Sequence, residues 1–147
     1  MSCDLILDTA LAEQFARDGF AYTPLLNADD VAELLACYRE VTPQMAAGFY
    51  TTLWSDDLEY RRKVHETICR VLDRRLGSVL RPSKYILTQF AVKQGGRTGT
   101  ACPLHQDWSM SDESRHPCVS VWCPLVDVDA GNGPLAVVPG RDRKSVV

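Results

Sequence analysis

His105, Gln106 and Asp107 form the triplet whose residue types and spacing are best suited to metal chemistry. On an extended segment, residues two apart point to the same face, so the His105 imidazole and the Asp107 carboxylate could bind one ion together. Such a pair supplies two of the three ligands in the 2-His-1-carboxylate triad of non-haem Fe(II) oxygenases. The donors are not soft enough for copper and not carboxylate-rich enough for calcium. The triplet therefore predicts an iron-type site with His105 and Asp107 as metal ligands.

The composition of the chain argues against several classes of partner. With 147 residues, 46% hydrophobic and 24% charged, the chain is typical of a single globular domain over residues 1–147. A net charge of −3 with only short basic clusters does not resemble a nucleic-acid binder. We see no secretory signal and no apolar run near the roughly 18 residues that span a bilayer. The six cysteines form no Cys-x-x-Cys pair, so we expect reduced thiols in a cytoplasmic protein.

The elements that must position these ligands begin with a short helix through Leu11 and Phe15. This helix is expected to stop near Gly19, since glycine is the usual residue just past a helix end. Residues 20–23 then resemble a short strand.

Two better-marked helices are predicted further along. Asn27 is a good N-cap for the second helix, whose apolar stripe comprises Val31, Leu34, Leu35 and Tyr38. The third helix is expected over residues 56–76, with Gly77 following it and an apolar face of Val64, Ile68, Val71, Leu72 and Leu76.

The second half of the chain is predicted to be rich in strands. Residues 85–92 and 135–138 have strand-like composition, and residues 94–99 form a glycine-rich loop. Residues 119–125 alternate, with Val119, Val121, Cys123 and Leu125 on one face and Ser120, Trp122 and Pro124 on the other. Helices followed by strands predict an α+β domain.

Three blocks of the second half, in this order, resemble the phytanoyl-CoA dioxygenase family of Fe(II)/2-oxoglutarate oxygenases. They are Pro103-Leu104-His105-Gln106-Asp107-Trp108, Val119-Ser120-Val121-Trp122-Cys123-Pro124-Leu125-Val126-Asp127, and Asn132-Gly133-Pro134-Leu135-Ala136-Val137-Val138-Pro139-Gly140. The opening Asp18-Gly19-Phe20 with its capped helix is also similar to the family, so the resemblance covers most of the chain.

The resemblance implies a double-stranded β-helix, a cupin-like jelly-roll of strands against which the N-terminal helices pack. It implies hydroxylation of a small organic substrate, with Fe(II) as the metal and 2-oxoglutarate as the cosubstrate. His105 and Asp107 would be the first two iron ligands. Because Asp107 is retained where related halogenases replace the carboxylate, hydroxylation is favoured over halogenation.

Five further residues acquire expected roles, four of them near the cosubstrate. Trp122 and Gln106 match family residues that lie beside 2-oxoglutarate. Gln89 or Lys93, which precede the metal motif, would bind one of its carboxylates by hydrogen bond or charge. Trp108 is expected to form a wall of the substrate pocket.

The sequence departs from the family pattern after Pro139-Gly140. Family members continue to a second histidine and to an arginine that holds 2-oxoglutarate, whereas here seven residues follow Gly140. We therefore expect a C-terminally incomplete product with negligible turnover. We also expect an exposed sheet edge through which the chain self-associates.

Two alternative interpretations stay open. Cys102, His105, His116 and Cys118 form a Cys2His2 set that could hold a structural zinc ion in a binding or interaction module. Prolines within both pairs and the unexplained Trp122 and Asn132 blocks make this set less attractive. The other alternative is a non-catalytic family fragment that acts through partners.

Overall fold

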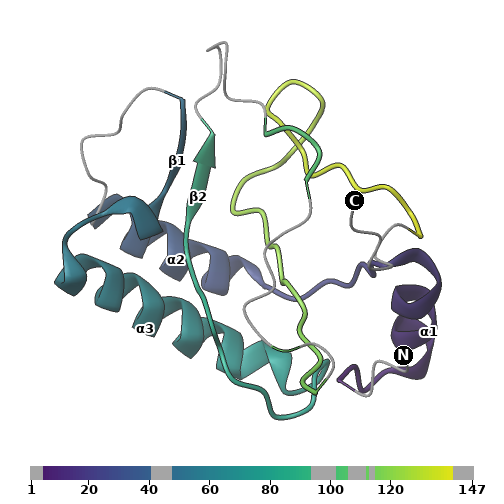
Figure 1. Cartoon of the computed structure of the whole chain (residues 1–147). Helices are drawn as coiled ribbons and strands as arrows, with labels where there is room; N and C mark the ends of the chain where they lie inside the picture. Colours follow the sequence, from purple (N-terminus) through teal and green to yellow (C-terminus); the bar gives the residue numbers. More distant parts are fainter. Residues whose placement is uncertain (1–4, 41–47, 94–101, 106–111, 113–114, 141–147) are drawn as a thin grey trace.

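The structure is a computed structural model that describes residues 5–40, 48–93, 102–105, 112 and 115–140. Its elements are, in order, α1 (Thr9–Asp18), α2 (Ala28–Glu40), β1 (Phe49–Thr51), the 3-10 helix η1 (Thr52–Trp54), α3 (Leu58–Leu76) and β2 (Ala91–Lys93). Figure 1 shows α2 and α3 side by side along one face, with the two strands rising from them. Helices combined with a small antiparallel sheet make this an α+β fold, as predicted.

Helix α1 ends at Gly19 as predicted, and it begins at an Asp8 cap that was not predicted. The Asp8 carboxylate accepts a hydrogen bond of 2.8 Å from the Leu11 backbone N–H. At the other end, Gly19 adopts the left-handed conformation with a φ of 80°, and its N–H donates to the Phe15 carbonyl. The strand predicted for residues 20–23 is wrong, because this segment pairs with no described strand.

Helix α2 begins with a reciprocal capping box. The Asn27 side-chain oxygen accepts a hydrogen bond of 2.9 Å from the Asp30 N–H, and the Asp30 carboxylate accepts one of 3.0 Å from the Asn27 N–H. Two backbone donors that a helix start leaves without partners are thus satisfied together. The predicted N-cap is confirmed.

Helix α3 is the longest element, and its buried face matches the predicted stripe. The Asp57 carboxylate caps its first turn by accepting from the Tyr60 N–H, and its buried residues are Val64, Thr67, Ile68 and Val71. The helix ends before Gly77 as predicted, but Gly77 keeps a right-handed conformation with a φ of −62°.

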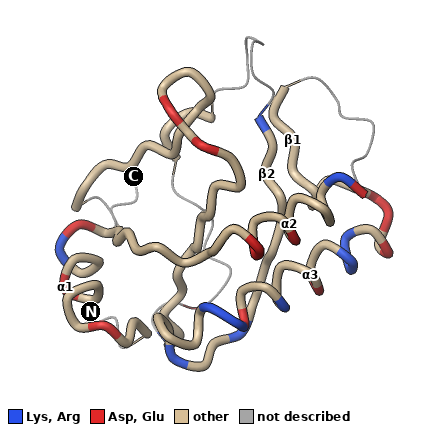
Figure 2. Tube along the Cα trace, turned by 180° about the vertical axis from the view of Figure 1, so that it is seen from behind, with Lys and Arg blue, Asp and Glu red and all other residues tan. Residues whose placement is uncertain are grey.

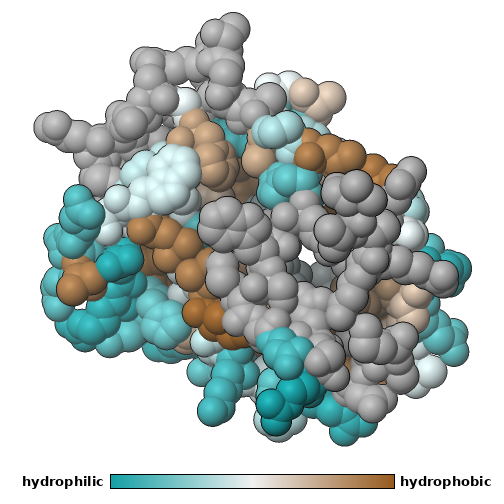
Figure 3. Space-filling model, viewed as in Figure 1, coloured by the Kyte–Doolittle hydropathy of each residue, from teal (hydrophilic) through white to brown (hydrophobic). Residues whose placement is uncertain are grey.

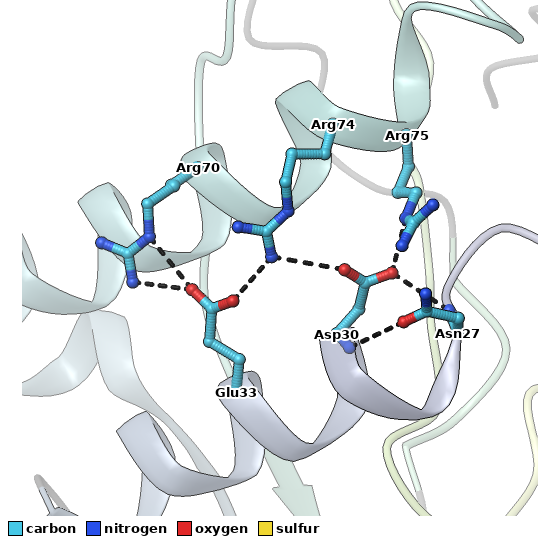
Figure 4. Close-up of polar contacts among 6 residues, drawn as sticks. All are labelled: Asn27, Asp30, Glu33, Arg70, Arg74 and Arg75. Atoms are coloured by element: carbon cyan, nitrogen blue, oxygen red, sulfur yellow. Dashed lines mark hydrogen bonds and ion pairs between the residues drawn. The ribbon is translucent and has the colours of Figure 1, made fainter.

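An ion-pair network holds the start of α2 against the end of α3 (Figure 4). The buried Asp30 carboxylate accepts from Arg75 at 2.6 Å and from Arg74 at 3.3 Å. Arg74 and Arg70 also bind Glu33, at 2.6 and 2.8 Å. The two helices are therefore antiparallel, and Figure 2 shows charged positions along both of them.

Apolar side chains from both helices and from the approach to β2 form the core between them. Its buried members are Leu34, Cys37, Val64, Ile68, Val71 and Phe90. The rings of Tyr38 and Phe90 meet edge to face at 5.8 Å. The core therefore ties the strand region to the helix pair.

The sheet is a two-stranded antiparallel ladder in which Phe49 pairs with Lys93 and Thr51 with Ala91. Just beyond it, the Thr52 N–H donates to the Phe90 carbonyl, and the Phe90 N–H donates to the Thr52 hydroxyl, each at 3.0 Å. These bonds hold the start of β2 against the turn into η1.

The structure corrects several strand predictions. Of residues 85–92, only the last two belong to β2, and within the described part of the chain neither residues 119–125 nor residues 135–138 form a strand. Strand β1, which lies between α2 and α3, was not predicted from the sequence. With only two strands described, the jelly-roll is not confirmed.

Residues 119–125, which are not hydrogen-bonded as a strand, keep the predicted alternation in exposure only in part, because Val121 is exposed although it was predicted on the same face as Val119, Cys123 and Leu125. Val119, Cys123 and Leu125 are half-buried, Leu125 packs against the core, and Trp122 points outward. Many apolar side chains after residue 103 are exposed, and Figure 3 shows hydrophobic surface on one face of the molecule. No helix in the described ranges is long and apolar enough to cross a membrane.

Candidate functional site

His105 follows a bend in the chain, and its ring is oriented by a backbone group. Nδ1 lies 2.8 Å from the Pro103 carbonyl oxygen. Because a carbonyl only accepts, Nδ1 must carry the proton, which places the lone pair of the neutral ring on Nε2. Metal-binding histidines are commonly oriented in this way by a carbonyl at the second ring nitrogen. The local geometry of His105 therefore suits metal ligation through Nε2.

Three of the predicted site residues lie outside the described part of the chain. These are Asp107, the second expected ligand, together with Gln106 and Trp108. The shared face of His105 and Asp107 stays a prediction.

The four residues of the zinc alternative are all described, and they do not assemble. The Cys102 sulfur lies 3.5 Å from His105 Nδ1, the nitrogen that already donates to Pro103. Among the described residues, no three of the His, Cys, Asp or Glu side chains come together as a metal-binding group. A Cys2His2 site is therefore not supported.

Gln89 is exposed and is held by Thr51 of the neighbouring strand. The buried Thr51 hydroxyl donates to the Gln89 side-chain oxygen. With its oxygen accepting, the amide directs its NH2 group away from Thr51 as a hydrogen-bond donor. A carboxylate is a suitable acceptor for such a donor.

Lys93 lies at the end of β2, on the same outward side as Gln89. Residues 89–93 alternate in exposure, with Phe90 buried, Val92 half-buried, and Gln89, Ala91 and Lys93 exposed. Side chains two apart on a strand share a face, so the Gln89 amide and the Lys93 ammonium lie on one face of this segment. Each of these two groups is a donor to which an anion could bind.

Trp122 is 48% exposed and is not a core residue. It stands on the outward side of residues 119–125, whereas burial raises the pKa of the neighbouring Cys123 thiol on the other side. The indole is thus open to a ligand.

His65 makes contacts on α3 that were not predicted from the sequence. Its Nδ1 lies 2.9 Å from the Thr88 hydroxyl, and its Nε2 lies 3.6 Å from the Cys69 sulfur one helical turn away. Burial and the nearby Asp73 raise the pKa of Cys69, so its thiol stays protonated at neutral pH. The i, i+4 spacing could have indicated this pair.

Comparison with known proteins identifies one family. The model of the family described as phytanoyl-CoA dioxygenase (PhyH) matches residues 46–146, more than half of the chain. The match includes His105, Gln89, Lys93 and Trp122, and it excludes α1 and α2. No curated protein and no solved structure matches the chain.

Proposed function

The chain belongs to the phytanoyl-CoA dioxygenase family, and from this premise we propose that it has the site of an Fe(II)/2-oxoglutarate-dependent dioxygenase. Its substrate would be a small organic molecule that becomes hydroxylated. Bound Fe(II), 2-oxoglutarate and O2 would supply the oxidising chemistry. The jelly-roll of the family would be the fold that holds this site.

The observation that carries this proposal is the orientation of His105. The Pro103 carbonyl holds the proton on Nδ1, so Nε2 can donate its lone pair to a metal without a change of tautomer. Asp107 would bring a carboxylate to the same ion. One imidazole nitrogen and one carboxylate oxygen are the donor types that non-haem Fe(II) accepts. The residues therefore fit the metal.

The exposed face of residues 89–93, which carries Gln89 and Lys93, is the proposed binding place of the cosubstrate. The Gln89 amide would donate to a carboxylate, and the Lys93 ammonium would add a charge-assisted hydrogen bond. Trp122 and Gln106 would flank the cosubstrate, and Trp108 would line the substrate pocket. In this role the protein binds and orients the ligands.

Replacing His105 with Ala tests the metal site. Mn(II) is a suitable probe for Fe(II), and its binding is followed from the electron paramagnetic resonance of the free ion. We expect His105→Ala to weaken Mn(II) binding by at least about tenfold, because even residues that only orient a metal ligand contribute 10- to 100-fold. Asp107→Ala should have a similar effect.

The matched control for this experiment is His116→Ala, which removes another exposed imidazole from the described region. It should leave Mn(II) binding unchanged, and Cys118→Ser should do the same. Equal affinity in the His105→Ala, Asp107→Ala and unaltered proteins would refute the proposed site. A loss in Cys118→Ser would instead favour the zinc module.

A further inference from the structure

The side chain of Lys93 lies directly against the backbone of Gly133, forty residues further along the chain. A Cβ atom at Gly133 would stand 3.2 Å from Lys93 Cδ and 3.5 Å from Nζ. A contact of 3.2 Å is tighter than ordinary packing, so a side chain at position 133 would shift the lysine side chain by a few tenths of an ångström. Gly133 also has a φ of 83°, which few residues other than glycine adopt.

The turn that carries Gly133 is held by its own hydrogen bonds. The Asp129 N–H donates to the Asn132 side-chain oxygen at 2.8 Å, and the Asn132 amide donates to the Asp127 carbonyl at 2.6 Å. The Gly131 N–H donates to the Asp129 carboxylate at 2.7 Å. These bonds fix the backbone of the turn over residues 127–132. The backbone of Gly133, which follows the turn, therefore has a defined position against Lys93.

The Lys93 ammonium has no partner of its own in the described part of the chain. No hydrogen bond or ion pair joins it to another residue there. The side chain is exposed but its stem is restricted by the turn. A cation restricted in this way has lost part of its rotamer entropy before it binds an anion.

We propose that Gly133 is the positioning residue for Lys93, and that the turn and β2 together direct the ammonium to a carboxylate of 2-oxoglutarate. This inference rests on the proposed function and adds to it that Gly133 sets the position of the Lys93 ammonium. Glycine is favoured at position 133 for two reasons, the left-handed backbone and the close approach of the lysine side chain. Gly133 itself touches no ligand.

Binding of 2-oxoglutarate to the Mn(II)-loaded protein tests the inference by isothermal titration calorimetry. Lys93→Gln should weaken binding by about tenfold, the usual effect of losing a charge-assisted hydrogen bond. Lys84→Gln, at another exposed lysine, should leave the affinity unchanged. Gly133→Ala should weaken binding several-fold by displacing the ammonium.

Two further variants separate positioning from backbone strain. Gly140 also has a positive φ, of 70°, but a Cβ there meets no atom within 4 Å, so Gly140→Ala should keep full affinity. Gly133→Asn accepts the left-handed backbone more readily than alanine and still places a Cβ against Lys93, so it should weaken binding as Gly133→Ala does. Circular dichroism confirms that each variant is folded.

The double variant Lys93→Gln, Gly133→Ala decides whether the glycine acts through the lysine. If it does, the double variant binds 2-oxoglutarate as Lys93→Gln does, because the second change has no ammonium left to displace. Additive losses, or equal losses in Gly133→Ala and Gly140→Ala, would overturn the positioning role. If Lys93→Gln binds Mn(II) normally and keeps its affinity for 2-oxoglutarate, this inference alone is overturned. If the unaltered protein does not bind Mn(II), the proposed function is overturned as well.

Discussion

Val71→Asp is expected to abolish cooperative unfolding of this protein. Val71 has 0% of its surface exposed and packs in the cluster that joins α2, α3 and Phe90. An ionised carboxylate there would have no cationic partner inside an apolar core, and burying it costs several kcal/mol or forces water into the core. Since the stability of a small domain is only about 5–15 kcal/mol, one such change removes most of it.

Thermal denaturation followed by circular dichroism at 222 nm measures this effect. The control is Val126→Asp, the same change at a valine that is 64% exposed. Its effect on the free energy of unfolding should stay within about 0.5 kcal/mol, as for most surface substitutions. A normal cooperative transition in Val71→Asp would mean that the helix pair does not form the core described above.

Asp30→Asn is expected to destabilise the protein at neutral pH and to have little effect in strong acid. Hydrogen bonds from Arg75 and from the Asn27 backbone lower the pKa of Asp30 from 3.8 to about 2. A carboxyl whose pKa is lower in the folded state contributes stability above its unfolded pKa, here 3.8. That contribution is lost as the pH falls through the folded value, so the unaltered and variant proteins should converge near pH 2.

Urea unfolding at a series of pH values checks this dependence. Asp29→Asn is the matched control, because Asp29 is exposed in the same first turn of α2 and takes no part in the α2–α3 ion pairs. The difference between the Asp30→Asn and unaltered proteins should be constant above about pH 5 and shrink progressively below it. A difference that persists undiminished below pH 2 would show that the ion pairs of Asp30 do not stabilise the fold.

The helices show how far local sequence determines this fold. Asp8, Asn27 and Gly19 act at helix ends through hydrogen bonds that span three or four residues, so their roles could be predicted from spacing alone. The buried stripe of α3 was likewise predictable, because a helix repeats its buried face every three to four residues.

The strands were predicted less well, because a strand is defined by a partner elsewhere in the chain. Residues 20–23 and 119–125 have strand-like composition, yet neither segment joins a ladder among the described residues. Residues 49–51 pair with residues 91–93 across an intervening helix. No local pattern shows which segments will meet at that distance.

The candidate site, like the fold, was in part predictable from the sequence and in part decided only by the tertiary structure. The sequence by itself determined the family, through three ordered blocks, and it predicted roles for His105, Gln89, Lys93 and Trp122, which lie within the matched region. Only the tertiary structure decided that Thr51 orients the Gln89 amide and that the side chain of Lys93 packs against Gly133. Both contacts join residues about forty positions apart. Such contacts depend on how the packed core brings distant backbone together, which residue spacing does not encode.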